Sequence, residues 1–165
     1  MHHHQSAVRT VLALTVATLT VSACGGYHAP LALAPQPARY TAAPFDTAWA
    51  RAVEFFANNN IPLQTLDKAN GLLSSSRVDL TPSQALSWAN CGKWGGDPII
   101  TRDTDPRTYV VTAQVSVTVH TNQNATAVRS TVALNGAVRG WRYASRLECV
   151  STGKFEDALF AYVTR

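Results

Sequence analysis

Residues 109–138, YVVTAQVSVTVHTNQNATAVRSTVALNGAV, carry the clearest structural pattern in the chain, because apolar and polar residues alternate along two long runs within them. Successive side chains of a β-strand point to opposite faces of a sheet, so the alternation predicts two half-buried strands joined by a turn at 121–124. The expected buried face of the first strand carries Tyr109, Val111, Ala113, Val115, Val117 and Val119. That of the returning strand carries Val128, Ser130, Val132, Leu134 and Val138.

A helix and a second hairpin are predicted before this stretch. The apolar residues from Phe45 onward recur at the spacing of one helical face, Asp46 can cap the helix, and the asparagines 58–60 end it. Between the extended runs 61–66 and 72–80, the dipeptide Asn70-Gly71 indicates a tight turn, because glycine tolerates positive φ.

Two further helices are predicted from their start signals. Thr81 and Gln84 form a capping box around Pro82, which predicts a short helix that ends near Asn90. A last helix is expected from about Lys154, with Gly153 or Thr152 as its cap. Glu54 and Glu156 are expected on the outward faces of their helices, as solvated charges.

The predicted order is therefore α-β-β-α-β-β-α. We expect an α+β fold in which an antiparallel sheet of about four strands packs against helices as a two-layer sandwich. This domain takes up residues 45–165.

The first residues have the features of an export signal. Arg9 precedes an apolar stretch from Val11 to Val21, which is shorter than the about 20 residues that span a bilayer. The tetrapeptide 21–24, VSAC, resembles the bacterial lipobox, in which small residues precede a cysteine that becomes the acylated N-terminus. We expect residues 1–23 to be removed and Cys24 to carry the lipid; an ordinary secretory signal with a chance cysteine is the alternative.

The segment 24–44 is rich in proline and alanine, and it predicts an extended tether between the lipid and the domain. No aspartate follows Cys24 directly. By resemblance to the enterobacterial sorting pattern, this implies the outer membrane, with the domain facing the periplasm.

The other two cysteines, Cys91 and Cys149, make an even pair in an oxidising compartment, and we expect a disulfide between them. The alternative is metal binding. Two cysteines alone do not complete a zinc site, and no neighbouring His or Cys has the spacing to do so.

Composition and motifs exclude several classes of function. The chain has 46% hydrophobic residues and a net charge of +4, too weak for nucleic-acid binding. No phosphate-binding loop or nucleophile motif is present, so we expect no enzyme, no cofactor and no metal. Three aspartates could supply calcium ligands, but ordinary loop turns are the preferred interpretation: Asp97, Asp103 and Asp105.

Aromatic and basic residues suggest where a partner could bind. Arg139, Trp141 and Arg142 form a basic-aromatic cluster, and Trp94 lies in a glycine-rich loop. These four residues are the candidate partner contacts. The alternative is a solvated link beside the disulfide.

The lipobox, the first helix, Asn70-Gly71 and the segments around Cys91 and 149–156 together resemble a group of small bacterial envelope lipoproteins. These have a helix-grip or BamC-like α+β domain, and most are of unknown function. The resemblance rests on the pattern Cys-x-Ser-Thr-Gly-x-x-Glu and on the layout of 45–165. It implies a non-catalytic accessory subunit of an outer-membrane or periplasmic assembly that binds another envelope protein. The alternative is a carrier or sensor that holds a small apolar ligand between helix and sheet.

Overall fold

The computed structural model describes residues 26–101, 104–105, 107–139 and 146–165 of the chain. Its helices and strands follow one another as β1 (Tyr27–His28), β2 (Arg39–Thr41), α1 (Phe45–Asn58), β3 (Leu63–Asp67), β4 (Leu72–Ser75), β5 (Val78–Asp79), α2 (Pro82–Trp88), β6 (Ala89–Asn90), β7 (Lys93–Trp94), β8 (Asp97–Pro98), β9 (Tyr109–Asn122), β10 (Ala125–Val138), β11 (Arg146–Ser151) and α3 (Lys154–Val163).

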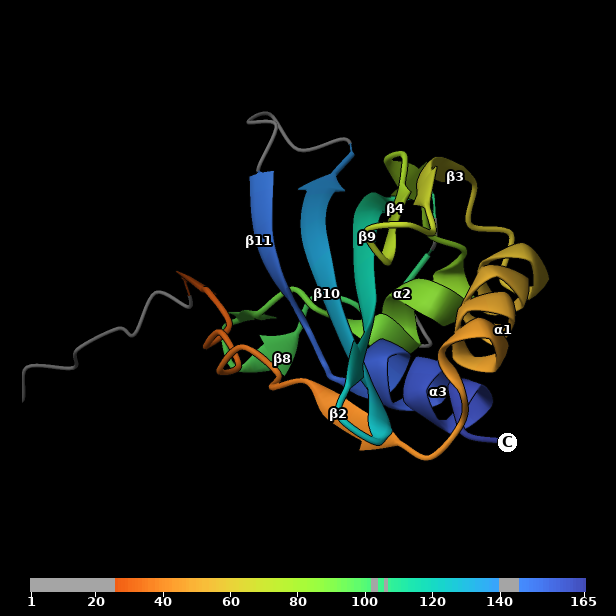
Figure 1. Ribbon diagram of the computed structural model, residues 1–165. Helices are drawn as coiled ribbons and strands as arrows, with labels where there is room; N and C mark the ends of the chain where they lie inside the picture. The colour runs from red at the N-terminus through yellow and green to blue at the C-terminus, as the bar shows by residue number, and fades with distance from the viewer. Residues whose placement is uncertain (1–25, 102–103, 106, 140–145) are drawn as a thin grey trace, which may run out of the picture.

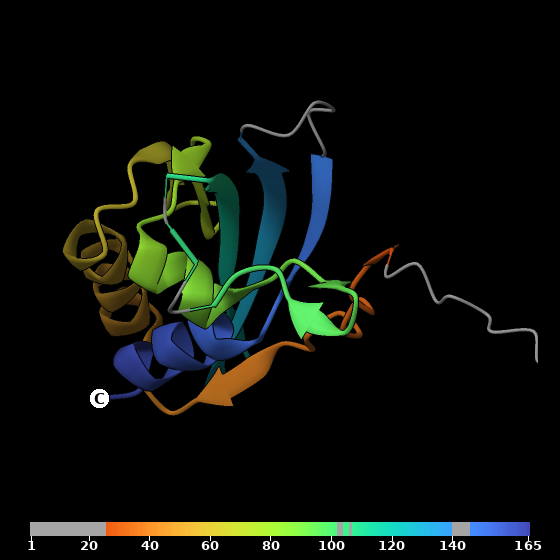
Figure 2. The ribbon, with the colours of Figure 1, turned by 180° about the vertical axis from the view of Figure 1, so that it is seen from behind.

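The long hairpin of β9 and β10 forms the centre of an eight-stranded antiparallel sheet (Figure 1). Along the sheet the order is β3-β4-β9-β10-β11-β6, with β2 paired to β10 and β5 paired to β9. The two long strands stay in register from the turn to their far ends, where Tyr109 lies opposite Val138. The helices α1, α2 and α3 lie on one face of this sheet (Figures 1 and 2).

The predicted sheet of about four strands, and with it the order α-β-β-α-β-β-α, is wrong. Strands contain 43% of the described residues, and β1, β7 and β8 form a second, three-stranded sheet. One of the additional strands, β11, has six residues; the others are only two or three residues long, too short to show a period of two in the sequence. They form because neighbouring backbone lies beside them and pairs with their N–H and C=O groups.

The segment after the predicted lipidation site also differs from the expected tether. β1 pairs with β7, and β2 pairs with β10. Arg39, at the start of β2, also forms an ion pair of 2.5 Å with Asp157 of α3. Residues 26–44 therefore run along the folded body, joined to it near both ends.

The buried face of β9 is the predicted one. Its alternating set from Tyr109 to Val119 is at most 6% exposed and faces the helices. The ring of Phe155 in α3 lies 5.5 Å from that of Phe55 in α1 and 5.0 Å from that of Trp88 in α2, both edge-on. One aromatic residue thus connects the three helices above the sheet.

The local helix signals have mixed outcomes. The capping box of Thr81 and Gln84 is present, which confirms the predicted start of α2, and Gly153 caps α3. Asp46 does not cap α1, because the N-cap is Pro44, two residues earlier, and Asp46 lies within the first turn of the helix. The Asp46 carboxylate instead pairs with Lys68 at 2.8 Å, on the surface.

The predicted turn at Asn70-Gly71 joins β3 to β4 and contacts β9. Gly71 has φ +62°, its carbonyl accepts the Val119 N–H at 2.8 Å, and a Cβ there would lie 1.9 Å from the Val119 carbonyl oxygen. Left-handed backbone costs a residue with a Cβ about 1–2 kcal/mol, and the clash adds to that cost.

We expect Gly71→Ala to lower the free energy of unfolding in urea by at least about 2 kcal/mol. Gly96→Ala is the matched control, since Gly96 also has positive φ but nothing lies within 4 Å of its Cβ position. Equal losses for the two variants would show that the contact with Val119 is unimportant.

Candidate functional site

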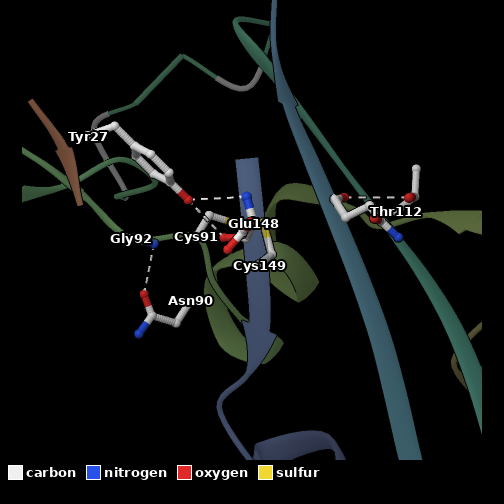
Figure 3. Close-up of a disulfide and its surroundings, with 8 residues drawn as sticks. Tyr27, Asn90, Cys91, Gly92, Thr112, Glu148 and Cys149 are labelled. Carbon is white, nitrogen blue, oxygen red and sulfur yellow. Dashed lines mark hydrogen bonds between the residues drawn. A yellow bond between two sulfur atoms is a disulfide. The ribbon is translucent and has the colours of Figure 1, made fainter. Parts of the chain in front are cut away.

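The disulfide between Cys91 and Cys149 is present, as predicted, and joins the chain after β6 to β11 (Figure 3). Both cysteines are buried beside the β9–β10 hairpin. Gly136 of β10 leaves the room they need, because a Cβ at that position would lie 2.6 Å from the Cys149 sulfur. The disulfide thus links β11 to the chain directly after β6.

Tyr27 holds the N-terminal segment against the outer edge of β11. Its hydroxyl accepts the backbone N–H of Glu148 and donates to the Glu148 carbonyl oxygen, each at 3.1 Å (Figure 3). Further along β11, Val150 and Ser151 pair with β6. The Tyr27 hydroxyl therefore satisfies the backbone groups of Glu148 on the same edge of β11 that pairs with β6 two residues further on.

A groove of about 490 Å³ lies beside Tyr27 and the β7–β8 hairpin. We call it the Trp94 groove; most of its lining is apolar, and it is bounded by Tyr27, Trp94, Asp97, Pro98, Ile99, Val138, Arg146 and Leu147. The Trp94 side chain is large and 45% exposed. Two walls of the groove are held in place: one by the disulfide at Cys149, two residues after Leu147 on β11, and one by the hydrogen bonds of the Tyr27 hydroxyl.

The structure brings only some of the predicted contact residues to this groove. Trp94 lines it, whereas Arg139 follows the lining residue Val138 and donates its backbone N–H to the Thr108 carbonyl at 2.6 Å. Trp141, Arg142 and the predicted lipidation site Cys24 lie outside the described residues.

Sequence reasoning missed most of the groove. Tyr27 was expected in an exposed tether, and Ile99 and Leu147 had no expected role; Arg146 was expected only as a further arginine of the basic-aromatic cluster. These residues come from three distant parts of the chain and share no spacing. The one available signal was Tyr27 itself, an aromatic residue in a segment rich in alanine, glycine and proline.

A second cleft, of about 400 Å³, lies between residues 32–36, β10 and the start of α3. Glu156 borders it and is 7% exposed, so the predicted outward position of this glutamate is wrong. The first turn of α3 packs against the end of β11, where Ser151 donates its hydroxyl to the Glu156 carboxylate at 2.8 Å. Ser151 also accepts the Gly153 N–H at 3.0 Å, so this pair stabilises the helix start.

The pKa shifts of titratable side chains have local causes. Burial raises the pKa of the Tyr109 phenol above its usual value, because the charged form loses its hydration. The guanidinium of Arg107 hydrogen-bonds Asp105 and lowers the pKa of that carboxyl. In the described parts of the chain, no three His, Cys, Asp or Glu side chains come together as ligands for a metal ion.

Among the described helices, none is both long and apolar enough to cross a membrane. No protein-family model matches the chain, and no curated protein matches it either.

Proposed function

We propose that this chain is a non-catalytic, lipid-anchored envelope protein that binds another envelope protein at the Trp94 groove. It would act as an accessory subunit of an outer-membrane or periplasmic assembly, anchored through acylated Cys24. The observation that carries the proposal is the groove itself, an apolar surface depression of about 490 Å³ bordered by a half-exposed tryptophan.

The chemistry of the groove favours a protein partner. Exposed apolar depressions mark interaction sites, and tryptophan and tyrosine are the residues that most often dominate their binding energy. Arg146 and Asp97 lie in the lining and supply charged groups for a polar rim. Because the disulfide and the Tyr27 hydroxyl hold the walls in place, little conformational entropy is lost when a partner binds.

The lipid anchor and the compartment are supported by the sequence. The lipobox-like VSAC segment follows an apolar stretch too short to span a bilayer. A disulfide also agrees with an exported protein, because the cytosol keeps most thiols reduced. The resemblance to BamC-like envelope lipoproteins supports a binding role and assigns no site residue.

The second candidate is a carrier for a small apolar ligand, because the groove volume falls in the range of about 300–1,000 Å³ typical of ligand sites. The space between helices and sheet, where such a ligand was first expected, contains fully buried side chains such as Phe56, Phe155 and Leu159. A carried ligand would therefore also have to bind in the Trp94 groove.

The test places a photo-crosslinking amino acid at position 94 of the full-length protein in cells, with a matched control at exposed Tyr40 on β2. We expect one envelope protein to crosslink from position 94 and not from position 40. With that protein purified, Trp94→Ala should weaken its affinity in detergent by about thirtyfold, the effect of losing about 2 kcal/mol at the aromatic contact that borders the groove. Tyr40→Ala should leave the affinity unchanged.

Equal affinities for wild type and Trp94→Ala would contradict the proposed site. A small apolar molecule that co-purifies with the wild type and is lost in Trp94→Ala, without any crosslinked protein, would favour the carrier.

A further inference from the structure

We infer that the lipid on Cys24 holds the β1–β7–β8 sheet directly against the bilayer, with the indole of Trp94 at the level of the lipid headgroups. The inference rests on the proposed lipid anchor. The sequence predicts a tether between the lipid and the domain. In this inference the domain instead contacts the membrane directly, through the β1–β7–β8 sheet.

The chain becomes part of the folded body almost immediately after Cys24. The Gly26 carbonyl accepts the Gly95 N–H at 3.4 Å, and Tyr27 and His28 pair in register with Trp94 and Lys93. The contacts around β1 are close on several sides. In addition to the two hydrogen bonds of Tyr27 with Glu148, a Cβ at Gly92 would lie 2.3 Å from the His28 carbonyl oxygen.

The length of chain between the anchor and this sheet is therefore very short. An extended residue spans at most about 3.6 Å, so the Cα of Cys24 lies within about 7 Å of the Cα of Gly26. Acyl chains on Cys24 are buried in the bilayer, which places the cysteine at the headgroup region. Gly26 and the β7–β8 turn bonded to it must then lie at the membrane surface.

The surface that the anchor brings there suits a lipid interface. Residues 93–98, which form the β7–β8 hairpin, are all exposed, and Trp94 is the large aromatic among them. Tryptophan favours the headgroup level because its ring is apolar and its N–H is a hydrogen-bond donor. The hairpin carries one cation, Lys93, and one carboxylate, Asp97, so we expect contact with zwitterionic lipid as well as with anionic lipid.

The Trp94 groove opens beside the same hairpin, since Trp94, Asp97 and Pro98 line it. A protein bound in the groove would accordingly be held next to the bilayer surface.

The experiment uses the full-length acylated protein reconstituted into phosphatidylcholine vesicles that carry a nitroxide quencher near the headgroup. Tryptophan fluorescence is compared for wild type, Trp94→Phe and the matched control Trp49→Phe, whose indole is buried in the core. We expect the quenched part of the wild-type emission to fall by at least half in Trp94→Phe and to persist in Trp49→Phe. A flexible Gly/Ser insertion of about 20 residues after Cys24 extends the attachment by roughly 25 Å and should also remove the Trp94 quenching.

Quenching that is unchanged in Trp94→Phe, or equally strong with the insertion, would overturn the inference. Intact mass spectrometry of the same preparation separates the two ideas. An acylated chain whose Trp94 is not quenched contradicts this inference alone, whereas a chain without lipid on Cys24 contradicts the proposed anchor.

Discussion

Replacing Cys91 and Cys149 together by serine is expected to lower the free energy of unfolding by about 4 kcal/mol. The two cysteines are 58 residues apart, and a crosslink over a loop of that length lowers the conformational entropy of the unfolded chain, which raises its free energy by about this amount. For a domain of this size, the melting temperature should fall by roughly 10–15 °C. Urea unfolding followed by tryptophan fluorescence measures the first quantity, and calorimetry the second.

The control is the wild type with its disulfide reduced, which should match the double variant. The serine hydroxyls fill nearly the same space beside Gly136, so packing around β10 changes little. If the double variant lost less than about 1 kcal/mol of unfolding free energy in non-reducing buffer, the disulfide would not restrict the conformations of the unfolded chain as the entropy argument requires.

The second large effect is expected at Phe155. This ring is 0% exposed and meets Phe55 and Trp88 edge-on, so Phe155→Ala opens a cavity where α1, α2 and α3 come together. Phenylalanine-to-alanine changes in a core cost about 3–5 kcal/mol, because apolar burial is lost and the surroundings collapse only in part. Urea unfolding of the variant should show a loss in this range, with the disulfide intact.

Tyr40→Ala is the matched aromatic control, since Tyr40 is 58% exposed on β2 and should lose less than about 0.5 kcal/mol. If Phe155→Ala were no more destabilising than Tyr40→Ala, the helices would not be held on the sheet by this aromatic contact.

Features that depend on residues close together in the chain could be predicted before the structure. The alternation over 109–138 predicted the central hairpin and its buried face, because side chains in a strand point to the two faces in turn. The capping box at Thr81 and the turn at Gly71 were equally readable, since each uses residues that are close in sequence. The Cys91–Cys149 disulfide followed from counting cysteines, once Cys24 was assigned to the lipid.

The size of the sheet and the position of the groove depend instead on contacts between distant parts of the chain. The short strands β1, β2, β5 and β6 exist because distant backbone lies beside them, and backbone pairing leaves no mark in two or three side chains. The same holds for Tyr27, whose hydroxyl partner is a backbone 121 residues away, and for Glu156, buried by packing between α3 and β11. Local patterns encode which face of an element is apolar; which elements meet is set by burial and hydrogen bonding across the whole chain.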